Sequence, residues 1–183
     1  MQSKHFTIKT MTKKEVELMI DWAAAEGWNP GLNDAECYFA ADPEGFLVGF
    51  LDDEPIATIS AINYHDVFGF IGFYIVKPGY RGKGYGIQIW NAALKRLEGL
   101  NIGLDGVVAQ QDNYKKSGFK LAYRNIRYEG SGGCSFPGSE IVQLSTLPFE
   151  TIDSYDRPFF PENRSGFDRS DPYMSGATST IAY

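Results

Sequence analysis

The sequence predicts an α/β (α+β) fold in which helices flank a mixed, mainly antiparallel central sheet. Three observations lead to this class. Three β-rich runs follow one another between residues 45 and 76, and only short turn-forming segments separate them. An apolar stripe at helical spacing follows these runs over residues 87–97. Shorter β-rich and helical segments then alternate up to residue 128, as expected where crossover helices cover a mixed sheet.

The first segments predict one strand and two helices. Residues 5–9 alternate between polar and apolar side chains, which indicates a strand. Thr12 and Glu15 have the spacing of a capping box, and apolar residues then repeat at helical spacing. A second, short helix is expected from about residue 33 to the Asp42-Pro43 pair.

The next segments predict a meander of strands and a longer helix. Residues 45–51 and 56–64 form an antiparallel hairpin, because a polar, turn-forming cluster joins them. Residues 68–76 add a third strand. The helix over residues 87–97 has one apolar stripe, which we expect to pack on the sheet. The stripe consists of Ile87, Trp90, Ala93, Leu94 and Leu97.

Three short elements are expected after this helix. Residues 104–109 are mostly apolar and predict a short strand. Residues 112–117 have the bounding signals of a helix of about one or two turns. Residues 119–128 alternate and predict the final strand of the sheet.

A change of composition at Gly130 predicts a boundary. Four residues of glycine and serine follow one another there, and the 54 residues from Gly130 to the end carry seven acids against three arginines. We therefore expect a domain over residues 1–129 and a C-terminal extension over residues 130–183. The extension has strand-like composition at 141–145 and helical composition at 149–160, but it is too short to bury a core of its own.

Composition and charge limit the classes of partner. The chain has 183 residues, of which 43% are hydrophobic, and this suffices for one well-packed core. A formal net charge of −6 argues against nucleic acid, whose binders usually carry a basic excess. The longest apolar run, residues 67–76, is far shorter than the ~20 residues that span a bilayer, so no membrane partner is expected. The N-terminus lacks a long apolar stretch of the secretory kind, which favours a cytoplasmic location.

The cysteines do not predict a metal or redox site. Cys37 falls in an expected helix and Cys134 in a glycine-rich loop, and the two lack the paired spacing of such sites. We therefore expect two unpaired thiols and no bound metal.

The most informative segment is residues 81–86, which read Arg-Gly-Lys-Gly-Tyr-Gly between a predicted strand and a predicted helix. Glycines let successive backbone N–H groups approach an anion, and the positive end of the helix dipole favours negative charge there. No Asp or Glu occurs between Val67 and Leu97. The cations in this interval are Lys77, Arg81, Lys83, Lys95 and Arg96. The segment therefore predicts a site for a small anionic ligand.

Two common phosphate-binding motifs do not fit this segment. A P-loop needs Ser or Thr after its Gly-Lys pair to hold magnesium, and here Gly84 follows Gly82 and Lys83. A dinucleotide fingerprint needs a further glycine three residues on, but Gly86 is followed by Ile, Gln and Ile. The structural alternative is a glycine-rich turn that only changes the chain direction.

The pattern Arg81-x-x-Gly84-x-Gly86 resembles the Gln/Arg-x-x-Gly-x-Gly/Ala signature of the GNAT superfamily of acetyl-CoA-dependent N-acetyltransferases. Downstream, Tyr114 followed by Gly118-Phe119 is similar to the second motif of that superfamily. The predicted order of elements is also similar. The resemblance covers about residues 5–129 and implies a GNAT-like acyl-CoA N-acyltransferase fold.

A particular branch of the superfamily joins two such domains in one longer chain. Residues 68–74 and 110–114 resemble this branch. Residues 155–161 are similar to the opening of its second domain, the remainder of which is missing here. The resemblance therefore implies the N-terminal domain of a tandem protein with a truncated second domain, or a naturally shorter relative.

The resemblance implies that the chain transfers acetyl from acetyl-CoA to an amine by direct attack in a ternary complex. The loop amides would bind the pyrophosphate of the coenzyme. The backbone at the end of the preceding strand would pair with the pantetheine arm like an extra strand. The implied coenzyme-binding residues are Ile75, Val76, Arg81, Gly82, Lys83, Gly84, Tyr85, Gly86 and Asn113.

Acetyl transfer needs a neutral amine, stabilisation of the oxyanion and a proton for the departing thiolate. Tyr114 occupies the family's general-acid position, and a backbone N–H near Val76 would hold the oxyanion. Many relatives carry a basic carboxylate on the central strand, but residues 68–76 contain none, so the base stays open. The candidates are Asp105, Glu36, His65 and Tyr74, acting directly or through water.

The acceptor is expected to be an amine of a small molecule or a peptide. Tyr64, Tyr74 and Trp28 are candidates for lining its pocket, with ordinary core packing as the alternative. The alternative function is a non-catalytic acyl-CoA-binding or protein-interaction module, which the missing carboxylate favours and Tyr114 opposes. The C-terminal extension is a candidate for mediating a homodimer.

Overall fold

The computed structural model describes residues 5–31, 33–126, 128, 130–131 and 144–165. Its contacts divide the chain into two compact units. One unit comprises Met1–Leu104 together with Leu144–Tyr183, and the other comprises Asp105–Gln143.

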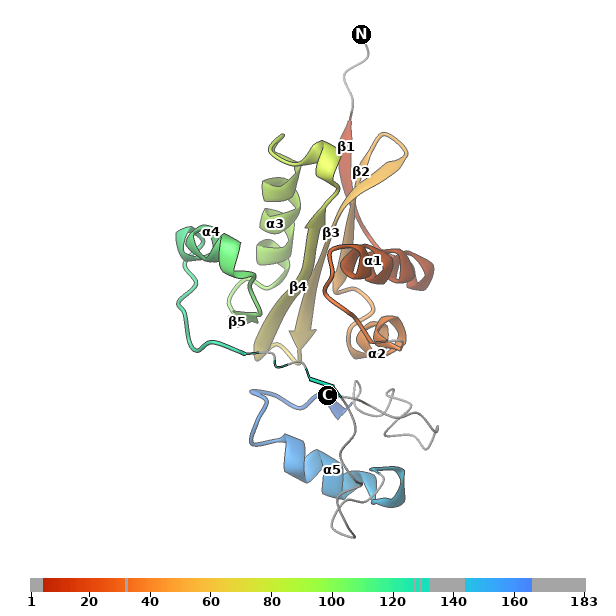
Figure 1. Ribbon diagram of the computed structural model, residues 1–183, viewed down its shortest axis with the longest axis vertical. Coiled ribbons are helices and arrows are strands. Elements are labelled where there is room, and N and C mark those ends of the chain that lie inside the picture. Colours follow the sequence, from red (N-terminus) through yellow and green to blue (C-terminus); the bar gives the residue numbers. More distant parts are fainter. Residues whose placement is uncertain (1–4, 32, 127, 129, 132–143, 166–183) are drawn as a thin grey trace. The chain divides into compact units, whose positions relative to one another are not determined.

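The first unit is built on a five-stranded sheet whose strands follow one another in chain order (Figure 1). The first four strands pair antiparallel, and the last two pair parallel. This confirms the mixed, mainly antiparallel sheet that the sequence predicts. The strands are β1 (Phe6–Thr10), β2 (Phe46–Leu51), β3 (Glu54–Tyr64), β4 (Phe68–Val76) and β5 (Asn101–Leu104).

Helices cover both faces of this sheet. Helices α1 (Lys13–Ala25) and α2 (Asp34–Ala41) lie on one face and α3 (Tyr85–Arg96) on the other (Figure 1). The expected capping box is present at the start of α1, where the Thr12 amide donates a 2.7 Å hydrogen bond to Oε2 of Glu15. This local signal in the sequence therefore predicted the start of α1 correctly.

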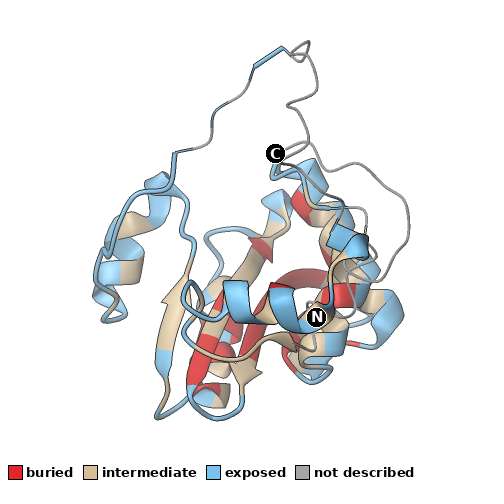
Figure 2. Cartoon of the chain, turned by 90° about the horizontal axis from the view of Figure 1, so that it is seen from below, coloured by how far each residue is buried: buried red, intermediate tan, exposed pale blue. Residues whose placement is uncertain are grey.

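Buried side chains concentrate along the strands and on the covering helices (Figure 2). The cluster beneath α1 consists of Met11, Val16, Met19, Phe46, Val48 and Ile62. Helix α3 contributes the buried residues Ile89, Trp90 and Ala93, and Leu97 directly after its end is also buried. The prediction for Ile87 was wrong, because its side chain is 55% exposed. The helix starts two residues before Ile87, and its apolar face is the one centred on Ile89 and Ala93.

Strand β4 contains a bulge at Phe73. This residue has a φ of +47°, and the register between β3 and β4 shifts between Thr58 and Ser60. The hydroxyl of Thr58 donates a 3.1 Å hydrogen bond to the carbonyl of Phe73. Thr58 is fully buried, so this bond holds the bulge from the neighbouring strand.

The bulge changes which side chains of β4 face α3. A β-carbon on Gly69 would touch Leu97, and the ring of Tyr74 lies 5.3 Å from that of Trp90. Tyr74 lies five positions after Gly69, and in a regular strand an odd number of positions puts two residues on opposite faces. The extra residue at Phe73 restores both to the face that α3 covers.

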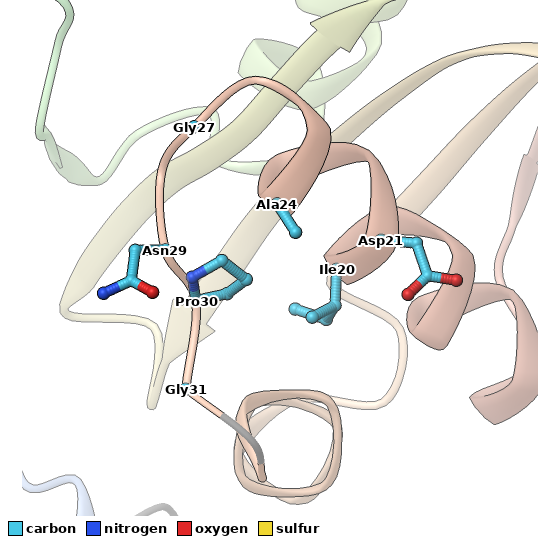
Figure 3. A pocket seen from close by; sticks show the side chains of 7 residues that line it. All are labelled: Ile20, Asp21, Ala24, Gly27, Asn29, Pro30 and Gly31. Atoms are coloured by element: carbon cyan, nitrogen blue, oxygen red, sulfur yellow. The ribbon is translucent and has the colours of Figure 1, made fainter.

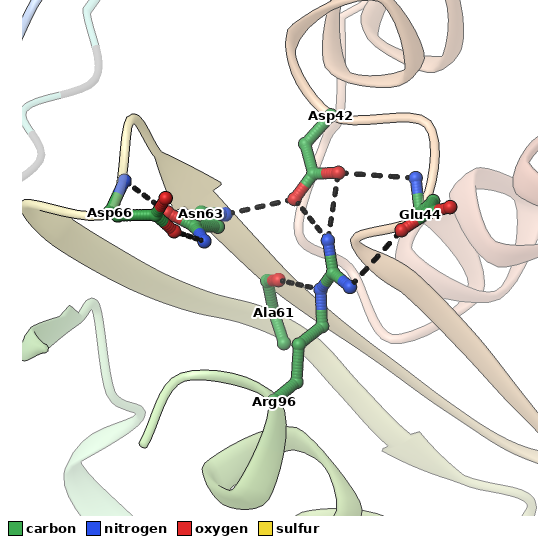
Figure 4. Close-up of polar contacts among 6 residues, drawn as sticks. All are labelled: Asp42, Glu44, Ala61, Asn63, Asp66 and Arg96. Atoms are coloured by element: carbon green, nitrogen blue, oxygen red, sulfur yellow. Dashed lines mark hydrogen bonds and ion pairs between the residues drawn. The ribbon is translucent and has the colours of Figure 1, made fainter. Parts of the chain in front are cut away.

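A network around Arg96 ties the end of α3 to the other layers (Figure 4). Its Nη2 donates to both carboxylate oxygens of Asp42, at 2.9 and 2.8 Å, and its Nε donates to the carbonyl of Ala61 at 3.1 Å. Asp42 also accepts from the backbone amides of Asn63 and Glu44. Asp42 is the C-cap of α2, so the network joins both helix layers through β3.

This network corrects the charge interpretation of the sequence. Lys95 and Arg96 lie in the last turn of α3, whereas the glycine loop precedes its first turn. Twelve helical residues correspond to about 18 Å. The two cations therefore do not add to a positive site at the loop, and the carboxylate of Asp42 neutralises Arg96.

The C-terminal segment packs on the hairpin between β3 and β4. It contains a 3₁₀ turn (Leu144–Thr146) and α5 (Phe149–Asp156). The Phe160 ring lies 5.0 Å from the ring of Tyr64 and 5.7 Å from that of Phe68, in edge-on geometry. The C-terminal segment therefore contributes to the packing of the same unit as the sheet.

Polar contacts hold Phe160 in this position. The guanidinium of Arg164 lies over the Phe160 ring at 4.8 Å and forms two hydrogen bonds with the carboxylate of Asp156. At the hairpin turn, Nδ1 of His65 lies 3.8 Å from Oε1 of Glu162. The segment thus contacts both sides of the turn.

The second unit contains the 3₁₀ turn Val108–Gln110 and helix α4 (Gln111–Lys116). The short helix expected at residues 112–117 is confirmed. The strand expected at residues 104–109 was wrong, because β5 ends at Leu104. Pairing with the first half of β4 sets the position of β5, and the local apolar run does not.

The final strand expected at residues 119–128 is also not found among the described residues of that range. Alternation shows that a segment can pair on a half-buried surface, but a strand forms only beside a partner. The strand expected at residues 141–145 falls largely outside the described residues. In the described part of the chain, no helix is long and apolar enough to cross a membrane.

Candidate functional site

The glycine loop adopts the open geometry that anion binding needs. Gly82 and Gly84 have φ values of +72° and +83°, and Gly84 is the N-cap of α3. A β-carbon at either position would have no heavy atom within 4 Å. The backbone of this loop is therefore accessible at the positive end of a twelve-residue helix.

Gly86 has a different role from the other two loop glycines. A β-carbon there would lie 2.5 Å from the hydroxyl oxygen of Tyr74 and 3.3 Å from a methyl carbon of Val76. The third glycine of the motif therefore lets the first turn of α3 approach β4 closely. Its conformation is that of an ordinary helical residue, so we assign it to packing and not to anion access.

The end of β4 lies beside this loop without a second partner strand. β3 pairs with β4 up to Val76, but β5 pairs with residues 68–71 only, and among the described residues no strand continues beside residues 72–76 on the β5 side. Ile75 is buried and Val76 partly buried. The side of β4 from which β5 has departed can therefore accept an extended ligand at its backbone.

Acidic side chains partly neutralise the cations in the loop and just before it. Lys77 lies 3.1 Å from Oε1 of Glu54, and Arg81 forms an ion pair with Glu26. The ammonium of Lys83 donates to the carbonyl of Gly79 at 2.8 Å. The sequence between Val67 and Leu97 contains no acids, but Glu26 and Glu54 reach this region from distant parts of the chain. The positive charge around the loop is therefore smaller than the sequence predicts.

Tyr114, the expected general acid, lies in α4 of the second unit. Burial raises the pKa of its phenol, and a hydrogen bond from the backbone of Val107 acts in the opposite direction. Gly118 has a φ of +93°, and the amide of Phe119 donates to the Tyr114 carbonyl at 3.1 Å. The Gly-Phe pair of the motif therefore terminates α4. The Asn113 side chain donates to Oε1 of Gln110 at 2.7 Å.

The candidate bases differ in their surroundings. Asp105, at the start of the second unit, accepts a 3.3 Å hydrogen bond from Asn125. Glu36 pairs with Lys13 at 2.6 Å, and this hydrogen bond lowers the pKa of the glutamate, which makes it a poor base. His65 is exposed in the hairpin turn.

The three aromatic residues considered for an acceptor pocket do not gather in one place. Tyr74 packs against Trp90 on the face covered by α3. Tyr64 packs against the cluster on the α1 face and against Phe160. Trp28 lies in the loop after α1 and is 37% exposed.

A shallow hollow of about 480 Å³ lies at the C-terminal end of α1 (Figure 3). The last turns of the helix contribute Ile20, Asp21 and Ala24, and the following loop contributes Asn29 and Pro30, among others. Asn29 has a φ of +50°, so the loop turns sharply beside the hollow. The lining therefore combines the apolar side chains of Ile20, Ala24 and Pro30 with one carboxylate, that of Asp21.

Two residues of this region could not be found from sequence patterns. Glu26 reaches Arg81 across 55 positions, and Thr58 reaches the bulge across 15. Neither belongs to a local motif, so only tertiary contact reveals them. In the described part of the chain, no three His, Cys, Asp or Glu side chains form a group that could hold a metal.

More than half of the chain matches a known protein family. The model of the family described as "Acetyltransferase (GNAT) family" matches residues 13–119. A curated relative, holothin acyltransferase of Pseudoalteromonas sp. (strain SANK 73390), is 38% identical over 165 residues. The match covers 90% of this chain and 55% of that protein. This chain spans about half or less of the length of the curated relatives that it matches.

Solved structures share the fold. A Pyrococcus horikoshii protein described as an acetyltransferase aligns with a TM-score of 0.57 and 24% identity, over 67% of this chain and 46% of that one. A Clostridium acetobutylicum protein described as an acetyltransferase and solved with acetyl-CoA aligns with a TM-score of 0.53 and 16% identity, over 68% of this chain and 96% of that one. At these identities the likeness concerns the fold alone.

Proposed function

Because this chain belongs to the acetyltransferase (GNAT) family, we propose that it transfers an acetyl group from acetyl-CoA to an amine of a small molecule or a peptide. The observation that carries the proposal is the geometry of the glycine loop. Gly82 and Gly84 leave backbone N–H groups accessible at the start of α3. The loop lies directly beside the end of β4, from which β5 has departed.

The coenzyme would occupy both features at once. Its pyrophosphate would bind to backbone amides between Gly82 and Gly86, where the helix dipole favours negative charge. Lys83 adds a cation that is held by a carbonyl and by no carboxylate among the described contacts. The pantetheine arm would run along the backbone of Ile75 and Val76 as an added strand. This arrangement directs the thioester toward the middle of β4.

The chemical step would be direct attack by the neutral amine on the thioester carbonyl. A C–N bond forms and the C–S bond breaks, while a backbone N–H near Val76 stabilises the oxyanion. The proton lost by the amine passes to a base, for which we propose Asp105. The departing thiolate takes the proton of the Tyr114 hydroxyl. A tyrosine phenol is protonated at neutral pH, so Tyr114 has a proton to give, and burial raises its pKa further.

The acceptor is the least determined part of the proposal. The relative that covers 90% of this chain is named for holothin, so holothin is the first acceptor to test. The family hosts many acceptors on one scaffold, and a panel of small-molecule and peptide amines should therefore accompany it.

The test measures thiol release from acetyl-CoA with each amine, together with coenzyme affinity by calorimetry. Tyr114→Phe is expected to keep the affinity and to lose about 10²–10⁴-fold in turnover, which is the usual contribution of a general acid. Tyr123→Phe is the matched control, because Tyr123 is 72% exposed in the same unit.

Tight binding of acetyl-CoA without turnover for any amine would support the alternative, a non-catalytic acyl-CoA-binding or interaction module. One observation favours that alternative, since β4 carries no carboxylate. Absence of coenzyme binding would overturn both the acetyltransferase and the acyl-CoA-binding module, and would leave only the interaction module.

A further inference from the structure

Arg81 connects three parts of the first unit. Its Nε donates a 2.7 Å hydrogen bond to the carbonyl of Val76, the last residue of β4. Its Nη2 forms an ion pair with the carboxylate of Glu26, the C-cap of α1. Arg81 itself directly precedes Gly82, the first glycine of the loop. One guanidinium therefore holds the loop, the end of β4 and the end of α1 together.

We propose that Glu26 is a positioning residue that couples the glycine loop to the end of α1, so that a coenzyme bound in the loop changes the hollow beside residues 27–31. The inference rests on the proposed function, because it takes the loop as the coenzyme site. Glu26 touches neither coenzyme nor acceptor in this proposal and acts through Arg81.

The end of α1 is built to pass on a displacement of Glu26. The amide of Glu26 donates to the carbonyl of Trp22 at 3.0 Å, and the amide of Gly27 donates to the carbonyl of Ala24 at 2.9 Å. The amide of Trp28 then donates to the carbonyl of Ala23 at 3.1 Å. Ala24 and Gly27 line the hollow. The backbone of Glu26 therefore belongs to the same hydrogen-bonded turn as residues that line the hollow, and this turn is the route that the proposal uses.

The chemistry of arginine suits this position better than that of lysine. A guanidinium presents several donors in a rigid fork, so it can serve the Val76 carbonyl and the Glu26 carboxylate at once. The Arg81 side chain is 49% exposed and that of Glu26 is 31% exposed. The pair is thus accessible to an anion that binds to the adjacent loop.

Two effects of removing Glu26 oppose each other. Loss of a carboxylate near an anionic ligand favours binding, but exposed charges are screened over about 8 Å at physiological salt. Loss of a charge-assisted hydrogen bond releases Arg81 and loosens the loop. We expect the second effect to dominate, so that Glu26→Ala weakens coenzyme A binding roughly tenfold, which corresponds to about 1.4 kcal/mol.

The experiment measures hydrogen exchange of peptides that cover residues 20–31, with and without coenzyme A at saturating concentration. In the wild-type chain, coenzyme A is expected to change the exchange of these peptides. Glu26→Ala should abolish that change even when the loop is saturated. Glu17→Ala is the matched control, since Glu17 is an exposed carboxylate on the same helix, and it should behave as wild type.

Different outcomes test the coupling through Glu26 and the proposed acetyltransferase function. An unchanged response at residues 20–31 in Glu26→Ala, or no response in a wild-type chain that binds coenzyme A, would overturn the coupling. Failure of the wild-type chain to bind coenzyme A would instead overturn the proposed function. Should Glu26→Ala unfold, Glu26→Gln replaces it; the amide still accepts a hydrogen bond, and the response should be reduced but not lost.

Discussion

The hydroxyl of Tyr74 on β4 occupies the space that a β-carbon at Gly86 would need, because the two atoms would lie 2.5 Å apart. Gly86 is the last glycine of the signature Arg81-x-x-Gly84-x-Gly86. The glycines of the signature therefore have two roles: Gly84 leaves the backbone exposed, and Gly86 permits close packing of α3 on β4. The two roles predict different consequences of mutation.

Gly86→Ala is expected to destabilise the protein by about 1–3 kcal/mol, as overpacking typically does. In a Tyr74→Phe background the same change should cost less, since the clashing oxygen is gone. Urea unfolding of the single and double variants measures the difference. Equal costs in both backgrounds would show that Tyr74 does not set the limit.

Gly84→Asp is expected to abolish measurable binding of acetyl-CoA, because it places a carboxylate where the pyrophosphate would lie. Gly99→Asp is the matched control: Gly99 has a φ of +88° and open space around its β-position, but it lies beyond the far end of α3. Calorimetric titration of both variants is the measurement. Wild-type affinity in Gly84→Asp would refute the loop assignment.

Asp42→Ala is expected to lower the free energy of unfolding by about 2–4 kcal/mol, because it leaves the largely buried Arg96 without its carboxylate. Glu44→Ala should cost less than ~0.5 kcal/mol, since Glu44 is 81% exposed and 3.8 Å from the guanidinium. Denaturant unfolding distinguishes the two. Similar losses would mean that the network does not depend on Asp42.

Phe160→Ala is expected to destabilise the docked C-terminal segment by about 1–3 kcal/mol, since it removes the ring that packs on Tyr64 and Phe68. Phe159 is 71% exposed, so Phe159→Ala provides a control with a similar sequence position. Limited proteolysis should cleave residues 157–165 faster in the first variant only. Equal cleavage rates would contradict this docking.

Stability is expected to fall at alkaline pH because of Tyr38. Burial raises the pKa of its phenol, Asp34 and Tyr64 add to the rise, and Arg164 opposes it. The folded state therefore holds the proton more tightly than the unfolded state. This contribution is complete below a pH of about 10, the ordinary value, and is lost as the pH rises above it.

Tyr38→Phe should reduce this alkaline loss of stability. Urea unfolding at pH 8 and at pH 10.5 gives the dependence for the wild type and the variant. Tyr123→Phe, at an exposed position, should leave the dependence unchanged. If the free energy of unfolding of Tyr38→Phe falls with pH as steeply as that of the wild type, groups other than Tyr38 cause the loss.

Local patterns were sufficient for much of the fold. The capping box at Thr12 is present, the hairpin and third strand occur where expected, and the helix after the glycine loop is in place. Each of these depends on interactions within a few residues or on one alternating face. The strands expected at residues 104–109 and 119–128 failed, because a strand also requires a partner that the local sequence does not specify.

The sequence by itself determined the family, the glycine loop and the helix that follows it, since caps, turns and periodicity are short-range properties of the chain. Only the tertiary structure decided what surrounds that loop. Glu26 and Glu54 form ion pairs with cations in and beside the loop, and the Tyr74 hydroxyl leaves no room for a side chain at Gly86. Asp42 neutralises Arg96, which lies at the other end of α3. These contacts join residues far apart in sequence, and their geometry exists only once the sheet has brought its helices together.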